Sequence, residues 1–205
     1  MRLLDLYCGA GGAAVGYHNA GFEIVGCDIK QQKNYPFEFH QMDAFKFLKE
    51  YYSEFDAIHA SPPCQAYSST VNMVPENKTK YPKDIKKLRS YLQSTKKPYI
   101  IENVPGAPLQ NHVILSGPMF GLGVIRTRHF EIKPNLLILT PDKKKEGTVI
   151  NGDYCTVAGE GCDGTSRIGV WRKDWMCKSE LRQAIPPAYT KFIGKILIRR
   201  LKGWG

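Results

Sequence analysis

Short apolar runs alternate with helix-like segments through the first half of the chain, and this alternation constrains the fold more than any other feature. Runs such as RLLDLY and FEIVGCDI have the length and apolar content of buried strands. The expected strands are residues 2–7, 22–29, 37–43, 55–61 and 97–104. The expected helices between them are residues 13–21, 44–52 and 81–95, the first closed by Gly21. Strands that alternate with helices form βαβ units, so the sequence predicts an α/β fold with a mostly parallel sheet.

The alternation weakens after about residue 105, where two further short strands are expected at residues 113–117 and 127–132. Near the end of the chain, residues 179–201 have a helical pattern that breaks near Pro186 and Pro187. Proline lacks the backbone donor that a helix interior needs. The sequence therefore predicts a broken helical tail after the sheet.

Residues 133–176 differ from the rest because they are rich in lysine, glycine and turn-forming residues. A chain of 205 residues suits one domain with at most a small appendage. We therefore expect a core made of residues 1–132 and 177–205, with a short insertion over residues 133–176.

Charge and cysteine content narrow the class of protein. The formal net charge is +10, which favours a polyanionic partner, with nucleic acid first. No apolar run reaches about 18 residues, so no membrane span is expected. The first residues reach a glycine turn too early for a secretory signal. Six scattered cysteines are expected to be reduced thiols, and the protein is expected in the cytoplasm.

The stretch DLYCGAGG, residues 5–12, predicts a strand, a glycine turn and a helix N-terminus. Such a turn forms a crevice at the carboxyl edge of a parallel sheet, where a ligand can approach the backbone closely. Asp28 ends the next strand and can accept hydrogen bonds from ribose hydroxyls, and Asp43 ends the third expected strand at the same edge. Together these residues predict a site for a nucleoside-containing cofactor, although a tight βα turn alone also occurs without a ligand.

The stretch SPPCQAYSS holds Cys64 in a stiff turn after the fourth expected strand. A free cysteine is usually a small buried hydrophobe, but a thiol at a sheet edge can act as a nucleophile when its thiolate is favoured. Glu102 ends the fifth expected strand at the same edge, where it is either a solvated strand end or a proton donor. Arg126 and Arg128 lie two residues apart, so on a strand both would point to one face.

The order of these motifs resembles that of the DNA (cytosine-5)-methyltransferase family. DLYCGAGG, then CD, PPCQ, ENV and RTR follow one another as they do in that family, over residues 1–132, and residues 180–198 resemble it more loosely. The resemblance implies a Rossmann-like core that uses S-adenosylmethionine, and double-stranded DNA as the partner. It also implies that Cys64 adds to C6 of a flipped cytosine so that C5 can take the methyl group.

Roles carry over residue by residue. Glu102 would hydrogen-bond or protonate N3 of the base, and Arg128, with Arg126, would bind the O2 side and help to keep Cys64 ionised. The implied cofactor contacts are Tyr7, Cys8, Gly9, Ala10, Gly11, Gly12, Asp28, Ile29, Asp43, Ala44 and Pro62. The implied DNA contacts are Gln65, Ser68, Lys143, Lys144, Arg167 and Arg172.

The chain departs from the family pattern at several positions. Val124 replaces a glutamine before the paired arginines, Ile29 replaces an aromatic residue after Asp28, and QAIPPAYT replaces a C-terminal Asn-Ser motif. The segment 133–176 is also short for a target-recognition region, which predicts a short target, relaxed specificity or an auxiliary protein.

The sequence leaves two other interpretations open and disfavours a third. The same core serves relatives that methylate tRNA, and a catalytically silent DNA-binding protein would keep the fold. The third is a zinc site, but the spacing of Cys155, Cys162 and Cys177 matches no common zinc motif, so no metal is expected.

Overall fold

The computed structural model describes residues 1–64, 67, 84–136, 138–141, 154 and 175–203. Its strands are β1 (Arg2–Leu6), β2 (Glu23–Asp28), β3 (Glu38–Gln41), β4 (Ala57–Ala60), β5 (Tyr99–Asn103), β6 (His112–Leu115) and β7 (Arg128–Lys133). Its α-helices are α1 (Gly12–His18), α2 (Ala44–Tyr51), α4 (Ile85–Ser94), α5 (Lys178–Gln183) and α6 (Pro187–Leu201). Two 3₁₀ turns, η1 (Tyr52–Glu54) and η3 (Gly117–Phe120), complete the described elements.

The described strands form one sheet in the order β3-β2-β1-β4-β5-β7-β6. The first five strands in that order are parallel, and β7 is antiparallel to both β5 and β6. This arrangement confirms the α/β fold and the mostly parallel sheet that the sequence predicts. Parallel strands bring their carboxyl ends to one edge, so the residues that follow β1, β2, β4 and β5 meet there.

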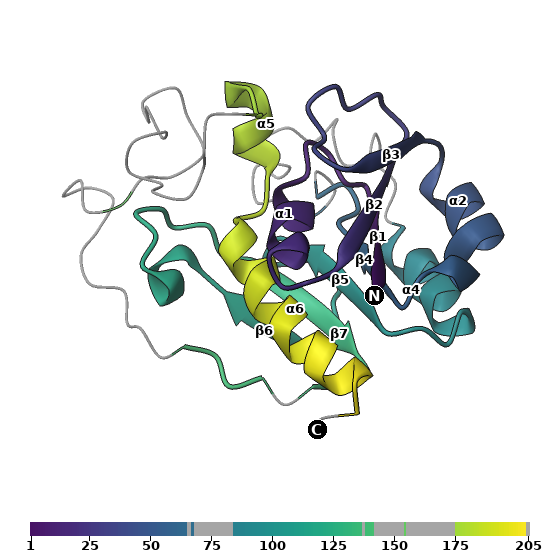
Figure 1. Cartoon of the computed structure of the whole chain (residues 1–205). Coiled ribbons are helices and arrows are strands. Elements are labelled where there is room, and N and C mark those ends of the chain that lie inside the picture. The colour runs from purple at the N-terminus through teal and green to yellow at the C-terminus, as the bar shows by residue number, and fades with distance from the viewer. Residues whose placement is uncertain (65–66, 68–83, 137, 142–153, 155–174, 204–205) are drawn as a thin grey trace.

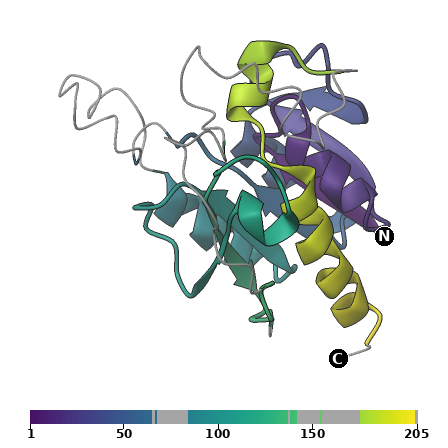
Figure 2. The ribbon, with the colours of Figure 1, turned by 90° about the vertical axis from the view of Figure 1, so that its left-hand side faces the viewer.

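Helices cover both faces of the sheet (Figures 1 and 2). One face carries α1 and α6, whose side chains join a core that includes Tyr17, Ile193 and Leu197. The other carries α2 and α4, packed through Phe47 and Leu92. Buried strand residues alternate between these two clusters, as the two-residue period of a strand requires.

Small residues let α1 and α6 approach closely. A Cβ at Gly16 would overlap the Thr190 hydroxyl oxygen and the carbonyl oxygen of Pro187. Because Gly16 has no side chain, Thr190 fits against α1, and its hydroxyl donates to the carbonyl oxygen of Ala13 at 2.8 Å. The C-terminal helix is therefore seated against the helix that follows the glycine turn, although 177 residues separate these two hydrogen-bonded residues in the chain.

Several element ends differ from the sequence prediction. Helix α1 ends at His18 with Asn19 as its C-cap, and Gly21 lies beyond the helix with φ of +112°. Asp43 does not end β3, which stops at Gln41. Its carboxylate is the N-cap of α2 and accepts from the backbone N–H groups of Phe45 and Lys46. A short polar side chain such as that of aspartate can accept hydrogen bonds from nearby backbone N–H groups, which favours a helix N-cap over a place in a strand.

A buried ion pair ties α4 to the antiparallel edge of the sheet. Arg89 Nε and Nη2 donate to the two carboxylate oxygens of Glu131, each at 2.7 Å. Gln110 N–H also donates to Glu131, at 2.8 Å. Burial of a charged pair is tolerated because these additional hydrogen bonds satisfy it. The pair holds β7, and with it the start of the strand at Arg128, in place beside β5.

Candidate active site

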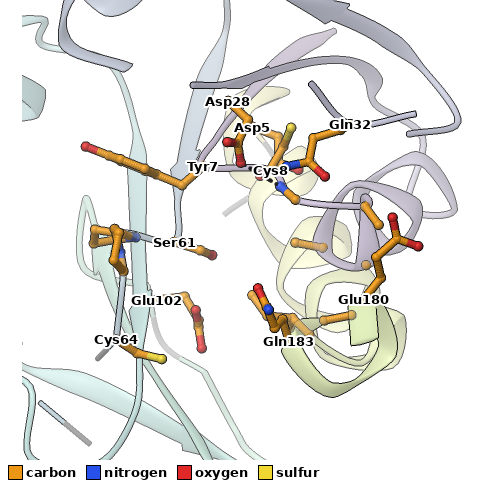
Figure 3. Close-up of a pocket in the computed structure, with 18 of the residues that line it drawn as sticks. Asp5, Tyr7, Cys8, Asp28, Gln32, Ser61, Cys64, Glu102, Glu180 and Gln183 are labelled. Atoms are coloured by element: carbon orange, nitrogen blue, oxygen red, sulfur yellow. Dashed lines mark hydrogen bonds between the residues drawn. The ribbon is translucent and has the colours of Figure 1, made fainter. Parts of the chain in front are cut away.

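A cavity of about 560 Å³ opens at the carboxyl edge of the sheet (Figure 3). It is lined by the β1–α1 turn, the ends of β2, β4 and β5, the segment that leads into β7, and α5. Cys64, Ser61 and Glu102 lie on one side of the view in Figure 3, and Glu180 and Gln183 lie on the other. The cavity is the place where the predicted cofactor and catalytic residues meet.

The β1–α1 turn forms the upper wall through an unusual backbone. Tyr7 and Gly9 have φ of 58° and 50°, in the left-handed region. A Cβ at Gly9 would meet no atom within 4 Å, so the glycine is needed for its backbone angle and not for space. Asp28 holds the turn, because its Oδ2 accepts from Gly9 N–H at 3.1 Å and its Oδ1 accepts from Lys30 N–H at 3.0 Å.

Most of the predicted cofactor contacts line this cavity. They are Tyr7, Cys8, Gly9, Ala10, Gly12, Asp28, Ile29, Asp43, Ala44 and Pro62. Gly11 is different. It precedes α1 with φ of +87°, and a Cβ there would meet Pro36 and Tyr35 at about 3 Å. Gly11 therefore shapes the turn from behind and does not line the cavity.

The opposite wall comes from a part of the chain far away in sequence. Glu180 in α5 accepts two hydrogen bonds from Asn34 Nδ2, at 3.1 and 2.9 Å. Trp175 Nε1 donates to the carbonyl oxygen of Ala10 at 2.8 Å. The lining residues of this wall are Gln32, Ser179, Glu180, Arg182, Gln183, Ala184 and Ile185. Gln183, Ala184 and Ile185 belong to the segment QAIPPAYT, which the sequence shows in place of the family's C-terminal motif. Sequence reasoning missed the other four, because no local pattern reports contacts between residues more than 140 positions apart.

Cys64 lines the cavity, at the lower end in the view of Figure 3, and is half-buried. Its turn is anchored by Asn103, whose Nδ2 donates to the carbonyl oxygen of Pro62 at 2.9 Å. Tyr67 N–H then donates to the carbonyl oxygen of Cys64 at 2.9 Å. Burial raises the pKa of the Cys64 thiol, and the nearby Arg128 guanidinium acts in the opposite direction. The thiol is thus held rigidly, and the neighbouring cation favours its ionised form.

Glu102 and Arg128 form an ion pair beside Cys64. Arg128 Nε lies 3.0 Å from Glu102 Oε1. Within the described residues, Glu102 Oε1 has no hydrogen bond of good geometry. Glu102 is 5% exposed, and burial raises the pKa of its carboxyl group despite Arg128 and Arg126. A buried carboxyl group that lines a cavity and has a raised pKa is suited to a hydrogen bond with a ligand.

Arg126 is buried just before β7 begins, so it does not share a strand with Arg128 as the spacing suggested. Its Nη2 donates to the carbonyl oxygen of Arg182 at 2.8 Å, and its own carbonyl oxygen accepts from the Tyr189 hydroxyl at 2.8 Å. Burial, and then repulsion from Arg128, lower the pKa of Arg126 to about 10, so it remains a cation at neutral pH. Both guanidinium groups nevertheless line the cavity with Cys64 and Glu102.

Two buried polar strand residues were also missed: Asp5, which lines the cavity, and His59. Asp5 in β1 is 1% exposed, and burial raises the pKa of its carboxyl group to about 8. The Tyr35 hydroxyl donates to Asp5 Oδ2 at 3.4 Å. His59 in β4 pairs with Asp5 in the sheet register, and burial lowers the pKa of its imidazole to about 3. In both cases the sequence shows a polar residue inside an apolar strand run, and this pattern could have indicated a buried polar group.

Other predicted residues lie outside the described part of the chain. These are the expected DNA contacts Gln65, Ser68, Lys143, Lys144, Arg167 and Arg172, together with Cys155 and Cys162. Cys177 is described, is exposed, and has its Sγ 3.0 Å from Ser179 Oγ. Within the described ranges, no helix is long and apolar enough to cross a membrane.

Comparison with known proteins gives a family match and several partial relatives. Residues 1–113 match the family model described as C-5 cytosine-specific DNA methylase. The Type II methyltransferase M.FnuDI of Fusobacterium nucleatum is 35% identical over 75 residues, which is 33% of this chain and 22% of that protein. The Type II methyltransferase M.HgiGI of Herpetosiphon aurantiacus is 34% identical over 82 residues, which is 34% of this chain and 64% of that protein.

Among solved structures, the methyltransferase EhMeth of Entamoeba histolytica superposes with a TM-score of 0.50 at 20% identity. The match covers 74% of this chain and 59% of EhMeth, and it supports the fold alone. The matched regions thus span less than two thirds of each of these proteins.

Proposed function

Because the chain belongs to the C-5 cytosine-specific DNA methylase family, we propose that it transfers a methyl group from S-adenosylmethionine to C5 of a cytosine in DNA. The observation that carries this proposal is the meeting of Cys64, Glu102 and Arg128 in one cavity with the glycine turn. A thiol, a buried carboxyl group and a guanidinium group are the three functions that activation of a cytosine ring requires.

The cavity residues fit S-adenosylmethionine, which supplies the methyl group when bound. Each carboxylate oxygen of Asp28 accepts one backbone N–H, and a carboxylate offers about four acceptor sites. Asp28 therefore retains capacity for ribose hydroxyls. The open left-handed backbone at Gly9 lets a ligand approach the turn, and Asp43 and Glu180 add acceptors to the lining.

Cys64 would act as the nucleophile. Its thiolate adds to C6 of the cytosine, and the electron pair displaced toward C5 makes that carbon nucleophilic. C5 then takes the methyl group, loses its proton to a base or to solvent, and expels the Cys64 thiolate. This sequence restores the aromatic ring and the enzyme, and its first step needs the ionised thiol that Arg128 favours.

Glu102 and the two arginines would stabilise charge on the ring. Glu102 lines the cavity, where its carboxyl group would hydrogen-bond to the N3 side of the base, and a protonated Glu102 can donate there. Arg128 and Arg126 would bind the O2 side. Glu102 and Arg126 are buried and Arg128 is partly buried, so their interactions with developing charge would be stronger than in water.

The target base must leave a duplex to reach such a cavity, so we propose that a flipped cytosine is the substrate. The net charge of +10 supports binding to the phosphate backbone of double-stranded DNA. Target choice would rest on residues 133–176, with an auxiliary protein as a further partner, and the site of action would be the cytoplasm.

The test uses the purified chain, methyl-labelled S-adenosylmethionine and two substrates, duplex DNA of mixed sequence and tRNA. The expected result is label in DNA cytosine, lost when Glu102 is replaced by Gln. Bisulfite sequencing of plasmid DNA from cells that express the protein then maps the methylated contexts. Label in tRNA and not in DNA would replace the proposed substrate, and cofactor binding without transfer to either would contradict the proposed activity.

A further inference from the structure

Three polar side chains form a hydrogen-bonded row from the core to the cavity. The Tyr17 hydroxyl lies 3.0 Å from His59 Nδ1. On the other side of the ring, His59 Nε2 lies 2.8 Å from Ser61 Oγ. His59 and Ser61 are two residues apart at the end of β4, so both point toward the face that Tyr17 covers.

The buried environment fixes the direction of the protons in this row. His59 is 0% exposed and its lowered pKa keeps the imidazole neutral, so one ring nitrogen donates and the other accepts. Within the described residues, the Tyr17 hydroxyl has His59 as its hydrogen-bond partner. A buried phenol that does not donate would be unsatisfied, so Tyr17 donates to Nδ1 and Nε2–H donates to Ser61 Oγ. The Ser61 hydroxyl hydrogen is then left for another acceptor.

The acceptor that the sheet places beside Ser61 is Glu102. In the β4–β5 register Ala60 pairs with Ile101, so the next residues, Ser61 and Glu102, are neighbours. Both line the cavity, and Figure 3 shows their side chains entering it from adjacent strands. A hydrogen bond from Ser61 also opposes the rise that burial causes in the pKa of Glu102.

We propose that Ser61 is a positioning residue for Glu102, with its hydroxyl aimed by His59 and Tyr17 so that it donates to the Glu102 carboxylate. This hydrogen bond fixes the rotation of the carboxyl group and leaves an oxygen facing the cavity. The inference rests on the proposed function only for the role of Glu102 toward the base.

Other charged and titratable groups around the row also influence the titration of Glu102 and His59. Glu102 is also faced by Arg128, Arg126, Cys64 and Asp5. His59 is faced by Asp5 across the β1–β4 register and by Tyr17. Substitutions at Ser61 or Tyr17 leave these charges in place, so a change in the titration of Glu102 reports the lost hydrogen bond.

The direct test is a carboxyl-carbon NMR titration of the free protein labelled with ¹³C-glutamate, in which Glu102→Gln identifies the Glu102 signal. Ser61→Ala should move the Glu102 midpoint to higher pH, because the carboxylate loses a donor. Tyr17→Phe, which removes one oxygen, should move it in the same direction by less. Ser61→Thr keeps the hydroxyl and should restore the wild-type midpoint.

Matched controls come from α4, on the other face of the sheet, where Ser90→Ala and Tyr91→Phe remove the same groups away from the row. Both should leave the Glu102 midpoint unchanged. An unchanged midpoint in Ser61→Ala, or an equal shift in the controls, would overturn the proposal.

The second readout is the pH–rate profile of methyl transfer. In Ser61→Ala, kcat should fall about tenfold, the fold-change that corresponds to one hydrogen bond to a charged group. The limb of the profile that belongs to Glu102 should move to higher pH, with the affinity for S-adenosylmethionine unchanged. The NMR titration needs no turnover, so a Glu102 shift in a protein that methylates nothing would support the positioning role and contradict the proposed function.

Discussion

The two walls of the cavity are built in different ways. The wall that carries Cys64 and Glu102 consists of the ends of β4 and β5, placed by sheet register, and of the turn after β4, anchored by Asn103. The wall that carries Glu180 and Gln183 consists of a six-residue helix held by Asn34 and of a segment held through Trp175. In the first of these, the strand-end wall, backbone ladders on both sides fix the strand ends, and one buried hydrogen bond holds the turn that leads to Cys64. The helical wall depends on a few side-chain hydrogen bonds, some of them exposed.

This difference suggests that one wall serves the chemical step and the other serves cofactor binding. Groups that must meet a reacting atom within tenths of an ångström lie on the strand ends, where their positions are least variable. In the proposed function the helical wall would close the cofactor side of the cavity, where a small displacement would change affinity more than rate. Substitutions in each wall should therefore affect different kinetic quantities.

The largest effect is expected from Cys64→Ser in the strand-end wall. A hydroxyl is a far weaker nucleophile than a thiolate at neutral pH, so methyl transfer should fall by at least about a thousandfold. Cofactor affinity, measured by calorimetry, should be unchanged, because the anchor from Asn103 to Pro62 remains. Near-normal turnover in the serine variant would show that no covalent step through this residue occurs.

The next effect is expected from Asp28→Ala, where the strand end meets the glycine turn. The variant loses the acceptor of the Gly9 N–H and the proposed acceptor of the ribose hydroxyls. Hydrogen bonds to charged groups contribute about 1.5–3 kcal/mol, so affinity for S-adenosylmethionine should fall about 10- to 100-fold. Asp28→Asn retains one acceptor oxygen, so its affinity for S-adenosylmethionine should lie between those of the wild type and Asp28→Ala. Equal affinity of all three proteins in calorimetry would remove Asp28 from the site.

Folding stability should depend on pH through Asp5, which is buried in the strand-end wall. Its folded-state pKa of about 8 lies above the unfolded value of about 3.9, so the folded protein holds a proton that the unfolded chain releases between these values. Stability from this group is therefore complete below about pH 4 and is lost as pH rises toward 8. The slope approaches about 1.4 kcal/mol per pH unit, or tenfold in the unfolding equilibrium.

Urea unfolding of the wild type and of Asp5→Asn at several pH values measures this term. The amide does not titrate. The free energy of unfolding of the variant should therefore increase relative to that of the wild type as pH rises from 5 to 8. A difference that stays constant over this range would show that Asp5 is not protonated in the folded state.

The smallest effect is expected in the helical wall, from Trp175→Phe. A smaller aromatic ring remains at this position, and the hydrogen bond to the Ala10 carbonyl oxygen is lost. One neutral hydrogen bond contributes about 1 kcal/mol, so cofactor affinity should weaken about fivefold with kcat unchanged. Asn34→Ala, which removes an exposed contact to Glu180, should weaken it less. A loss of kcat as large as that in Cys64→Ser would contradict the division between the walls.

The same difference explains what could be predicted from the sequence. Local sequence patterns predict the strands, the glycine turn, Asp28 and Glu102, because an apolar run followed by a polar residue indicates the end of a strand. The role of Asp43 as a helix cap was missed, because strand ends and N-caps share residue types. The contacts from Trp175 to Ala10 and from Glu180 to Asn34 depend on how the C-terminal helix packs on α1, and no short pattern encodes that packing.

The row from Tyr17 through His59 to Ser61 is an intermediate case. A histidine within the β4 run is visible in the sequence, but its partner on α1 is fixed only when the sheet and the helix pack together. Likewise, the pairing of Arg126 with the carbonyl oxygen of Arg182 follows from tertiary structure and not from the spacing of the two arginines.

The covalent role of Cys64 is tested most directly by trapping. Duplex DNA of mixed sequence carrying 5-fluorocytosine allows thiolate addition and methyl transfer, but fluorine cannot leave C5 as a cation, so the enzyme is not released. With S-adenosylmethionine, the wild type should form a complex that survives denaturation and whose mass is that of protein plus methylated DNA, and Cys64→Ser should form none. Methylation of ordinary cytosine by the wild type with no trapped complex, or a trapped complex with Cys64→Ser, would contradict addition of Cys64 to C6.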